Sequence, residues 1–188
     1  MAVNSFMVPL GTSAPAFALP SLDGNIVRSE EFGAWQPLLV MFLSNHCPYV
    51  RHIEKELAAV IAHYTDWGVA AVAISSNNVE THPDDGPAGL AEQVQRAGFT
   101  FPYLLDETQE VALAYRAACT PDFFLYDSVR TLIYRGGFDE STPKNGVPVT
   151  GSALRNALEL AMSGKPVAEP HAPSMGCGIK WKPGNEPS

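Results

Sequence analysis

The arrangement of apolar and polar residues is clearest in the first half of the chain. Two runs, residues 38–43 and 69–74, contain only apolar side chains, which is typical of strands that are buried on both faces of a sheet. Between them, from residue 48 to about 64, apolar side chains recur at helical spacing and predict an amphipathic helix. Its predicted buried face consists of Val50, Ile53, Leu57, Val60, Ile61 and Tyr64, with Glu54, Lys55 and Glu56 pointing elsewhere.

Shorter patterns predict the elements on either side. Residues 16–19 and 25–27 flank the turn Asp23-Gly24, which favours a small hairpin. Residues 123–127 and 131–135 are rich in aromatic and branched side chains, and they predict a second, antiparallel hairpin. Further helices are expected at 90–97, 107–117 and 152–162, with an extended stretch at 98–106.

This order of elements predicts an α/β fold in which helices flank a central mixed β-sheet. Residues 1–165 are expected to form one domain that begins with the N-terminal β-hairpin. Residues 166–188 are rich in Pro and Gly and predict an extended C-terminal tail. The polar stretch 75–86 follows the second buried run, so it is expected to lie at the carboxyl end of a strand, where open α/β sheets usually bind ligands.

Cys47 is the main candidate for chemistry. It stands between the first buried strand and the predicted helix, and Pro48 suits the first helical position, where its missing N–H costs nothing. The free N–H groups and the positive dipole at a helix N-terminus favour an anion, which lowers the pKa of a thiol and produces the reactive thiolate. The alternative is that Cys47 is a buried packing residue.

Composition narrows the function classes. The 188 residues are 46% hydrophobic, only 17% are charged, and the net charge is −8. An acidic chain argues against nucleic acid and against an anionic membrane surface as partners. The sequence has no apolar stretch of membrane-spanning length and no convincing signal peptide, so a cytoplasmic location is expected. Three cysteines in a reducing compartment favour a catalytic or redox role over a disulfide framework. No cofactor or metal is expected.

The second half of the chain adds a resemblance. A helix-capping cysteine followed later by Thr120-Pro121 and a β-hairpin resembles the thioredoxin fold, and this implies a cis Pro121 that faces Cys47. Within that superfamily the chain is similar to the peroxiredoxin-like AhpC/TSA (redoxin) group, and most similar to an uncharacterised peroxiredoxin-like subgroup. The signatures are Asn45-His46-Cys47-Pro48-Tyr49-Val50, Phe101-Pro102-Tyr103-Leu104-Leu105-Asp106, Thr120-Pro121 and the tail Gly176-Cys177-Gly178-Ile179-Lys180-Trp181-Lys182-Pro183-Gly184-Asn185-Glu186-Pro187.

The chain also departs from both family patterns. A thioredoxin has Cys-x-x-Cys here, but the fourth residue is Val50. A peroxiredoxin has Pro-x-x-x-Thr-x-x-Cys, and here Ser44 replaces the Thr and Val40 the Pro. Peroxiredoxins also have an arginine that polarises the peroxide, and this chain has Pro121 at the corresponding position. Arg51, one helical turn beyond Cys47, is the alternative source of positive charge, and Asn45, His46, Pro48 and Arg51 are the expected substrate-binding residues.

An oxidised thiol is usually released by a second thiol. Cys177 is the favoured resolving residue, because its Gly-flanked tail could swing over the site. Cys119 is the second candidate, because it lies two residues before Pro121. The third possibility is that no internal thiol resolves Cys47.

Three functions follow from these residues. The first is a thiol-dependent oxidoreductase in which Cys47 attacks a peroxide or a disulfide, with Ser44, Thr120 and Pro121 at the site. Its reductant would be a thioredoxin-like protein or a low-molecular-weight thiol. A homodimer is a possible assembly. The second is a copper chaperone, with ligands drawn from His46, Cys47 and His52 together with His82, His171 or Cys177. The positive charge of Arg51 opposes that function. The third is a redox sensor without turnover.

Overall fold

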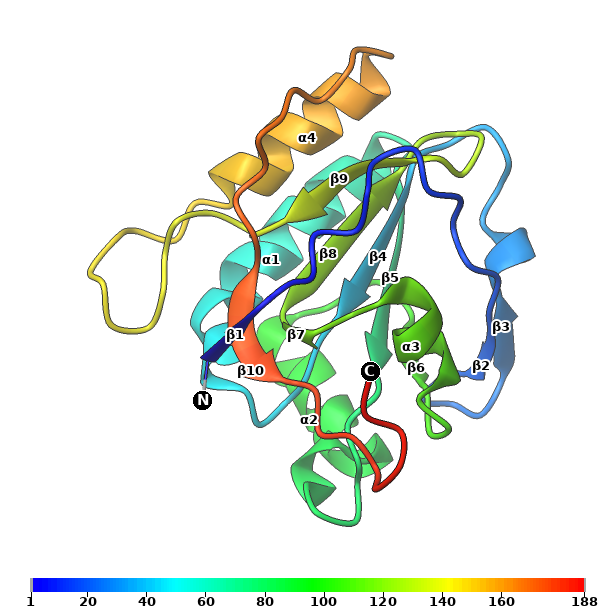
Figure 1. Cartoon of the computed structure of the whole chain (residues 1–188), viewed down its shortest axis with the longest axis vertical. Coiled ribbons are helices and arrows are strands. Elements are labelled where there is room, and N and C mark those ends of the chain that lie inside the picture. The colour runs from blue at the N-terminus through cyan, green and yellow to red at the C-terminus, as the bar shows by residue number, and fades with distance from the viewer. Residues whose placement is uncertain (1, 188) are drawn as a thin grey trace.

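The computed structural model describes residues 2–187, and a five-stranded mixed sheet lies at its centre (Figure 1). The strand order is β6–β5–β4–β8–β9. β4 (Leu38–Phe42), β5 (Ala70–Ser75) and β6 (Tyr103–Leu105) are parallel, whereas β8 (Asp122–Tyr126) and β9 (Leu132–Gly136) add an antiparallel pair beside β4. The mixed sheet that the two apolar runs and the late hairpin predict is therefore confirmed.

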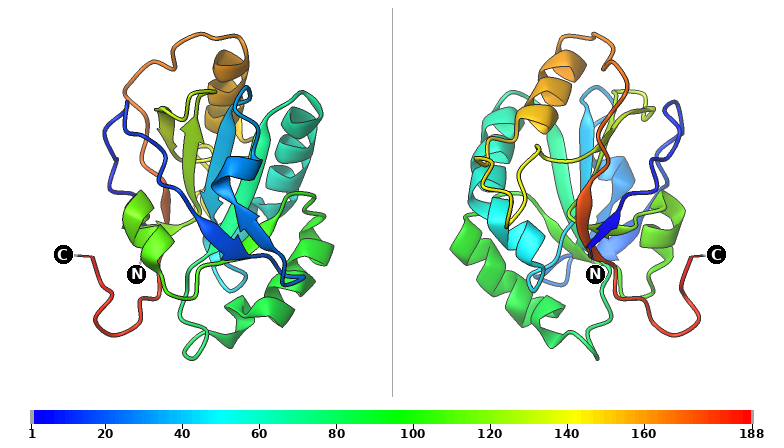
Figure 2. Two further views of the ribbon diagram at one scale, coloured as in Figure 1. Left: turned by 90° about the vertical axis from the view of Figure 1, so that its right-hand side faces the viewer. Right: turned by 60° about the vertical axis from the view of Figure 1, so that its left-hand side comes forward.

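Helices cover both faces of this sheet (Figure 2). One face packs against α1 (Pro48–Asp66), α2 (Pro87–Ala97) and α4 (Ser152–Met162). The other packs against α3 (Glu110–Tyr115) and the N-terminal hairpin of β2 (Ala18–Pro20) and β3 (Ile26–Arg28), which a 3-10 turn at Ser29–Glu31 follows. Successive side chains of β4 alternate between the two cores, which explains why this strand has no polar position.

A second, smaller sheet was not predicted. It consists of β1 (Ala2–Asn4), β10 (Met175–Gly178) and β7 (Cys119–Thr120), with β10 in the middle and antiparallel to both neighbours. Figure 1 shows orange-red β10 crossing the molecule beside dark blue β1. The C-terminal tail is therefore held against the rest of the chain, while its separation from a domain of residues 1–165 stays a prediction.

Hydrogen bonds with Asn77, Asn78 and Gln109 fix the tail beyond β10. The backbone N–H of Lys180 donates to Asn77 Oδ1 at 2.8 Å, and the carbonyl of Lys180 accepts the N–H of Asn78 at 2.8 Å. The side chain of Gln109 donates to the same carbonyl at 2.9 Å and accepts the N–H of Lys182 at 2.7 Å. The tail is thus tied to the loops that follow β5 and β6.

Two details differ from the sequence-based predictions. Glu54 is buried, because Arg96 on α2 pairs with its carboxylate at 2.8 Å and satisfies the charge. The helix expected at 107–117 is shorter, because Asp106 accepts the N–H groups of Val111 and Ala112 and caps a helix that begins at Glu110. No helix within residues 2–187 is both long and apolar enough to cross a membrane.

The docking of β10 depends on a glycine. A Cβ on Gly176 would overlap the carbonyl oxygen of Thr120, whereas the nearest atom to a Cβ on Gly178 would be in the side chain of Val3, at 3.2 Å. We expect Gly176→Ala to weaken tail docking by about 1–3 kcal/mol, the usual cost of overpacking. Limited proteolysis should then cut the tail of this variant faster than that of Gly178→Ala, and equal cleavage rates would contradict the prediction.

Candidate active site

Cys47 stands where the sequence predicts, between the end of β4 and the start of α1. It is the N-cap residue of α1, and Pro48 is the first helical residue. The side chain is fully buried, and its thiol donates a hydrogen bond to the carbonyl oxygen of Thr120 at 3.0 Å. The Thr120–Pro121 peptide bond is cis, as expected. The reactive-thiol candidate and the proline loop therefore meet at one point.

The structure brings Cys177 to the same point. β10 pairs with β7 in a register that sets Cys177 opposite Thr120, and Cys177 packs against the buried cluster that contains Cys47. Cys177 is partly exposed, whereas Cys47 beneath it is not. Two cysteines that are 130 positions apart in the sequence thus form a facing pair.

This pairing favours the thiolate of Cys47. A hydrogen bond from Cys177 lowers the pKa of Cys47 to about 5; burial opposes this change, while the side-chain hydroxyl of Thr120 and the N–H of Val50 support it. The same interaction, together with burial, raises the pKa of Cys177. Both shifts favour a Cys47 thiolate, which no longer donates to Thr120, beside a neutral Cys177 thiol, and this is the arrangement of a nucleophile with a proton donor beside it.

Cys119 lies in a different environment. It is fully buried, and its thiol faces the carbonyl oxygens of Pro121 at 3.6 Å and Ser174 at 4.0 Å. Burial raises its pKa, and the nearby carboxyl group of Asp122 adds to this effect. The thiol of Cys119 thus faces backbone carbonyls, whereas β10 sets Cys177 opposite Thr120, whose carbonyl contacts Cys47, so the geometry favours Cys177 over Cys119 as the partner of Cys47.

A buried carboxylate, Asp85, holds the loop before Cys47. Its oxygens accept hydrogen bonds from the hydroxyl of Ser44 at 3.0 Å, from the backbone N–H of Asn45 at 2.6 Å and from the side chain of Asn77 at 2.8 Å. Nδ1 of His46 also lies against it. Burial alone would raise the pKa of Asp85, but the hydrogen bonds from His46 and Asn77 outweigh it and hold this pKa below its usual value.

Arg51 and Asn45, two of the residues expected to bind substrate, contact this loop and its supports, and their role in substrate binding stays a prediction. Arg51 donates to the carbonyl of Asn45 at 2.6 Å. The Asn45 side chain donates to the carbonyls of Asp84 and Gly89, and its oxygen accepts a hydrogen bond from Arg96. Ser44 donates to Asp85. These contacts make Ser44 and Asn45 positioning residues of the Cys47 loop.

Sequence reasoning did not identify Asp85 or Arg96. The only sequence signal for Asp85 is its place in a polar loop after a buried strand, and nothing in that loop separates Asp85 from Asp84.

For the copper hypothesis, the rings of His46 and His82 lie 4.6 Å apart. Within residues 2–187 no group of three or more His, Cys, Asp or Glu side chains could hold a metal ion. That hypothesis stays a prediction, which a copper titration followed by absorbance would test.

The Cys177 hydrogen bond has a measurable consequence for pH dependence. Alkylation requires the thiolate, so the rate for Cys47 should rise with a midpoint near its pKa of about 5. Cys177→Ala removes the largest stabilisation of the anion, and we expect this midpoint to move to higher pH. Iodoacetamide labelling followed by mass spectrometry measures it, with Cys119→Ala as the control. An unchanged midpoint in Cys177→Ala would refute the assigned cause.

Comparisons with solved structures place this geometry among known proteins. An uncharacterised conserved protein from Geobacillus kaustophilus is 49% identical, with a TM-score of 0.94 over 97% of both chains. A hypothetical protein from Sinorhizobium meliloti 1021 is 45% identical, with a TM-score of 0.94 over 96% of this chain and 99% of the other. The thioredoxin domain of a thiol-disulfide oxidoreductase from Bacteroides vulgatus has a TM-score of 0.60 at 18% identity, over 80% of this chain and 99% of that domain. The fold is thioredoxin-like.

The sequence itself shows the family. A Mycobacterium tuberculosis (strain H37Rv) protein named "Putative peroxiredoxin Rv2521" is 29% identical over 107 residues. The match covers 57% of this chain and 63% of that relative, so it spans less than two thirds of the relative's length. The sequence profile of the AhpC/TSA family matches residues 10–135, which include Cys47, Thr120 and Pro121. The chain therefore belongs to the AhpC/TSA family, within the thioredoxin-fold redox proteins.

Proposed function

We propose that the protein is a two-cysteine thiol oxidoreductase in which the Cys47 thiolate attacks a peroxide or a disulfide and Cys177 resolves the product. The observation that carries the proposal is the facing pair itself. Cys47 caps a helix with its pKa lowered to about 5, and the strand that presents Cys177 is paired onto Thr120. Membership of a thioredoxin-fold redox family supports the same chemistry.

The reaction with a hydroperoxide consists of two steps. The Cys47 sulfur bonds to the terminal oxygen while the O–O bond breaks, and the departing alkoxide or hydroxide takes up a proton from solvent water, so that Cys177 keeps its own. Sulfur is oxidised to a sulfenic acid, and the peroxide is reduced to an alcohol or to water. The Cys177 sulfur then attacks this sulfenic acid, a disulfide forms, and the hydroxyl leaves as water with the Cys177 proton.

A disulfide substrate would follow the same route through a mixed disulfide, which Cys177 would release. In both cases an external thiol, either a thioredoxin-like protein or a small molecule, donates the two electrons that restore the thiols. This dependence on reduced thiols suits the cytoplasm. A homodimer would be compatible with the cycle but is not required by it, since both cysteines come from one chain.

Access to Cys47 requires movement of β10. The sulfur is fully buried beneath the strand that carries Cys177, so even a small oxidant needs that strand to shift. Gly176 and Gly178 flank Cys177, and glycine lowers the barrier to such backbone rearrangement. In the proposed cycle the same strand opens to admit substrate and closes to bring Cys177 onto the oxidised sulfur.

The test is a non-reducing peptide map by mass spectrometry after the reduced protein receives one equivalent of hydrogen peroxide. We expect a Cys47–Cys177 disulfide, its loss in Cys177→Ser and its persistence in Cys119→Ser. A Cys47–Cys119 disulfide would change the resolving residue. Labelling of Cys47 by a small aromatic disulfide but not by peroxide would leave only the thiol–disulfide exchange reaction. Failure of Cys47 to react with either reagent would overturn the proposal.

A further inference from the structure

The chain segment that leads into β10 is held to β9 by a buried pair of side chains, Arg135 and His171. Each residue is only 8% exposed, although one is charged and the other can take up a proton. Nη1 of Arg135 lies 3.1 Å from Nδ1 of His171, and Nη2 pairs with Glu169 at 2.9 Å. The ring of His171 also packs against Tyr134, with ring centroids 4.7 Å apart. The tail therefore meets β9 through titratable groups that the proposed cycle does not use.

The hydrogen bond between these two residues requires a neutral imidazole. Arginine has only N–H donors, so Nδ1 of His171 must be the acceptor and the ring proton must be on Nε2. Nε2 is buried and has no hydrogen-bond partner among residues 2–187. A proton on Nδ1 would break the contact with Arg135 and bring a second positive charge beside the first.

The surroundings of His171 oppose that second charge. Burial and the guanidinium of Arg135 lower the pKa of His171, and the carboxylate of Glu169 offsets only part of this effect. Tyr134 contributes no charge, because burial raises the pKa of its hydroxyl. His171 therefore takes up a proton more readily after it has left this site for water, and a fall in pH favours release of the tail.

The segment 172–174 connects His171 to β10. The hydroxyl of Ser174 donates to the carbonyl of Gly136 at 2.5 Å, so this segment and the Arg135–His171 pair both hold the tail to the end of β9. β10 begins at the residue after Ser174. Release at His171 would therefore loosen the chain directly before the strand that covers the buried sulfur.

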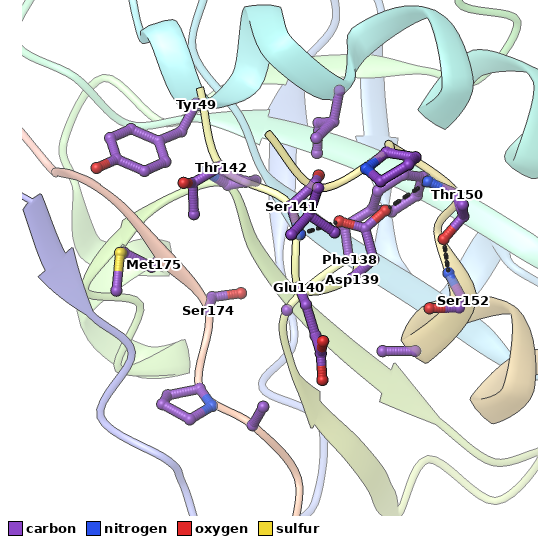
Figure 3. A pocket seen from close by; sticks show the side chains of 18 of the residues that line it. Tyr49, Phe138, Asp139, Glu140, Ser141, Thr142, Thr150, Ser152, Ser174 and Met175 are labelled. Carbon is purple, nitrogen blue, oxygen red and sulfur yellow. Dashed lines mark hydrogen bonds between the residues drawn. The ribbon is translucent and has the colours of Figure 1, made fainter. Parts of the chain in front are cut away.

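One side of this segment faces open space. Residues 172–175 line a pocket of about 570 Å³, and the loop after β9 lines its other side (Figure 3). Figure 3 shows Ser174 and Met175 on the tail and Asp139 and Thr150 on the loop. The segment thus has room to move once the contact with β9 is broken.

We propose that Arg135 and His171 form a pH-dependent latch on β10. While His171 is neutral, the pair holds the strand over Cys47. When His171 takes up a proton from water, the pair separates and the strand opens more often. His171 is then a positioning residue that acts on the site through β10.

The consequence for chemistry rests on the proposed function, in which β10 must move before an oxidant reaches Cys47. Acid should then increase access to the sulfur. The pKa of Cys47 is about 5, so its sulfur is still largely a thiolate just below pH 6.5, the ordinary pKa of a histidine. Access and reactivity therefore coincide in that range. The latch itself does not depend on thiol chemistry.

His171→Asn tests the latch, because its side-chain oxygen keeps an acceptor for Arg135 and does not titrate. His63→Asn is the matched control, since His63 is exposed on α1 and its ring packs on Tyr64 and Trp67. His171→Gln serves if His171→Asn does not fold, which thermal unfolding will show. The measurement is amide hydrogen exchange of residues 174–178 in the reduced protein, followed by mass spectrometry between about pH 7.5 and pH 5.5.

The ratio of the exchange rates of wild type and His171→Asn at one pH cancels the intrinsic pH dependence of exchange. We expect this ratio to rise by up to about tenfold between pH 7.5 and pH 5.5, because a released histidine with its ordinary pKa of 6.5 favours the open state by about tenfold for each pH unit below it. The ratio of wild type to His63→Asn should stay constant. The rate at which dithiodipyridine, an aromatic disulfide that stays reactive in acid, labels Cys47 should follow the same ratios.

The latch would be overturned by a ratio of wild type to His171→Asn that does not change with pH, or by an equal change in the ratio to His63→Asn. Failure of both His171 variants to fold would overturn it as well, because a hydrogen-bond acceptor would then not be enough to hold the tail. Labelling of Cys47 that ignores the change in exchange would show that the latch does not control access. Failure of the proposed function looks different: the exchange ratio would still rise in acid while no reagent oxidised Cys47.

Discussion

Cys47→Ser is expected to lower the reduction of peroxide or disulfide on the order of 10³-fold or more, the scale seen when an enzyme loses its nucleophile. A serine hydroxyl stays protonated at neutral pH, so neither the helix N-terminus nor the hydrogen bond from Cys177 can convert it to an anion. The measurement is consumption of substrate with dithiothreitol as reductant, under conditions in which wild type turns over many times.

Cys177→Ser should separate the two steps of the same cycle. Cys47 should still be oxidised, but it should stop at a sulfenic acid that dimedone traps, because no neighbouring thiol displaces the hydroxyl. Cys119→Ser should retain the disulfide-forming step.

If Cys47→Ser kept activity within about tenfold of wild type, another group would have to be the nucleophile, and the facing pair would have lost its assigned role.

The elements that the sequence predicts well are those in which one pattern repeats. β4 and β5 are apolar almost throughout, and α1 has seven buried apolar positions, six of them predicted from helical spacing, so the βαβ unit and the place of Cys47 follow from local reasoning. Pro48 marks the first residue of α1 because proline is favoured there and disfavoured one turn later. The place of the thiol at the helix N-terminus therefore follows from the order of residues alone.

The second sheet could not be predicted in the same way. β7 has two residues, and two of the four residues of β10 are glycines, so neither strand has an alternating pattern to detect. Both exist because they pair with each other over a long sequence separation, which places Cys177 opposite Thr120. The sequence indicated that Cys177 could serve as a partner, but its contact with Cys47 depends on that pairing.

Buried charges were missed for a related reason. Helical periodicity assigns Glu54 to the solvent side, yet Arg96 from α2 supplies the charge that makes its burial possible. In the loop after β5, Asp84 is exposed and Asp85 is fully buried. The 3-10 turn at Pro83–Asp85 decides which of the two neighbouring carboxylates faces the Cys47 loop. Composition and spacing do not contain that information.

Asp85 links the two halves of the site. It binds the loop of Ser44, Asn45 and His46, which ends at Cys47. It also binds Asn77, whose oxygen accepts the N–H of Lys180, three residues after Cys177. The carboxylate of Asp85 thus positions the loop that leads into Cys47. Through the side-chain amide of Asn77 it also positions the segment that follows Cys177. Its loss should disturb both thiols together.

Asp85→Asn is therefore expected to destabilise the protein by about 3 kcal/mol, which is typical when a buried charge network loses its acceptor. The new amide would place a donor against the donors of Asn45, His46 and Asn77. The melting temperature should fall by about 6–12 °C, and formation of the Cys47–Cys177 disulfide should slow. Asp84→Asn is the matched control, since an exposed substitution usually changes stability by less than about 0.5 kcal/mol.

The pH dependence of this effect distinguishes the charge of Asp85 from a merely local packing change. Its folded-state pKa lies below the ordinary value of 3.8, so the ionised carboxylate contributes stability that is fully present above that value. The contribution is lost as pH falls through the folded-state pKa. The difference in unfolding free energy between wild type and Asp85→Asn should thus be largest near neutral pH and shrink below about pH 4. Urea unfolding across this range measures it. If the difference in unfolding free energy between wild type and Asp85→Asn stays constant with pH, the shape of the side chain rather than its charge holds the loop. If that difference equals the one for Asp84→Asn, Asp85 does not position the thiols.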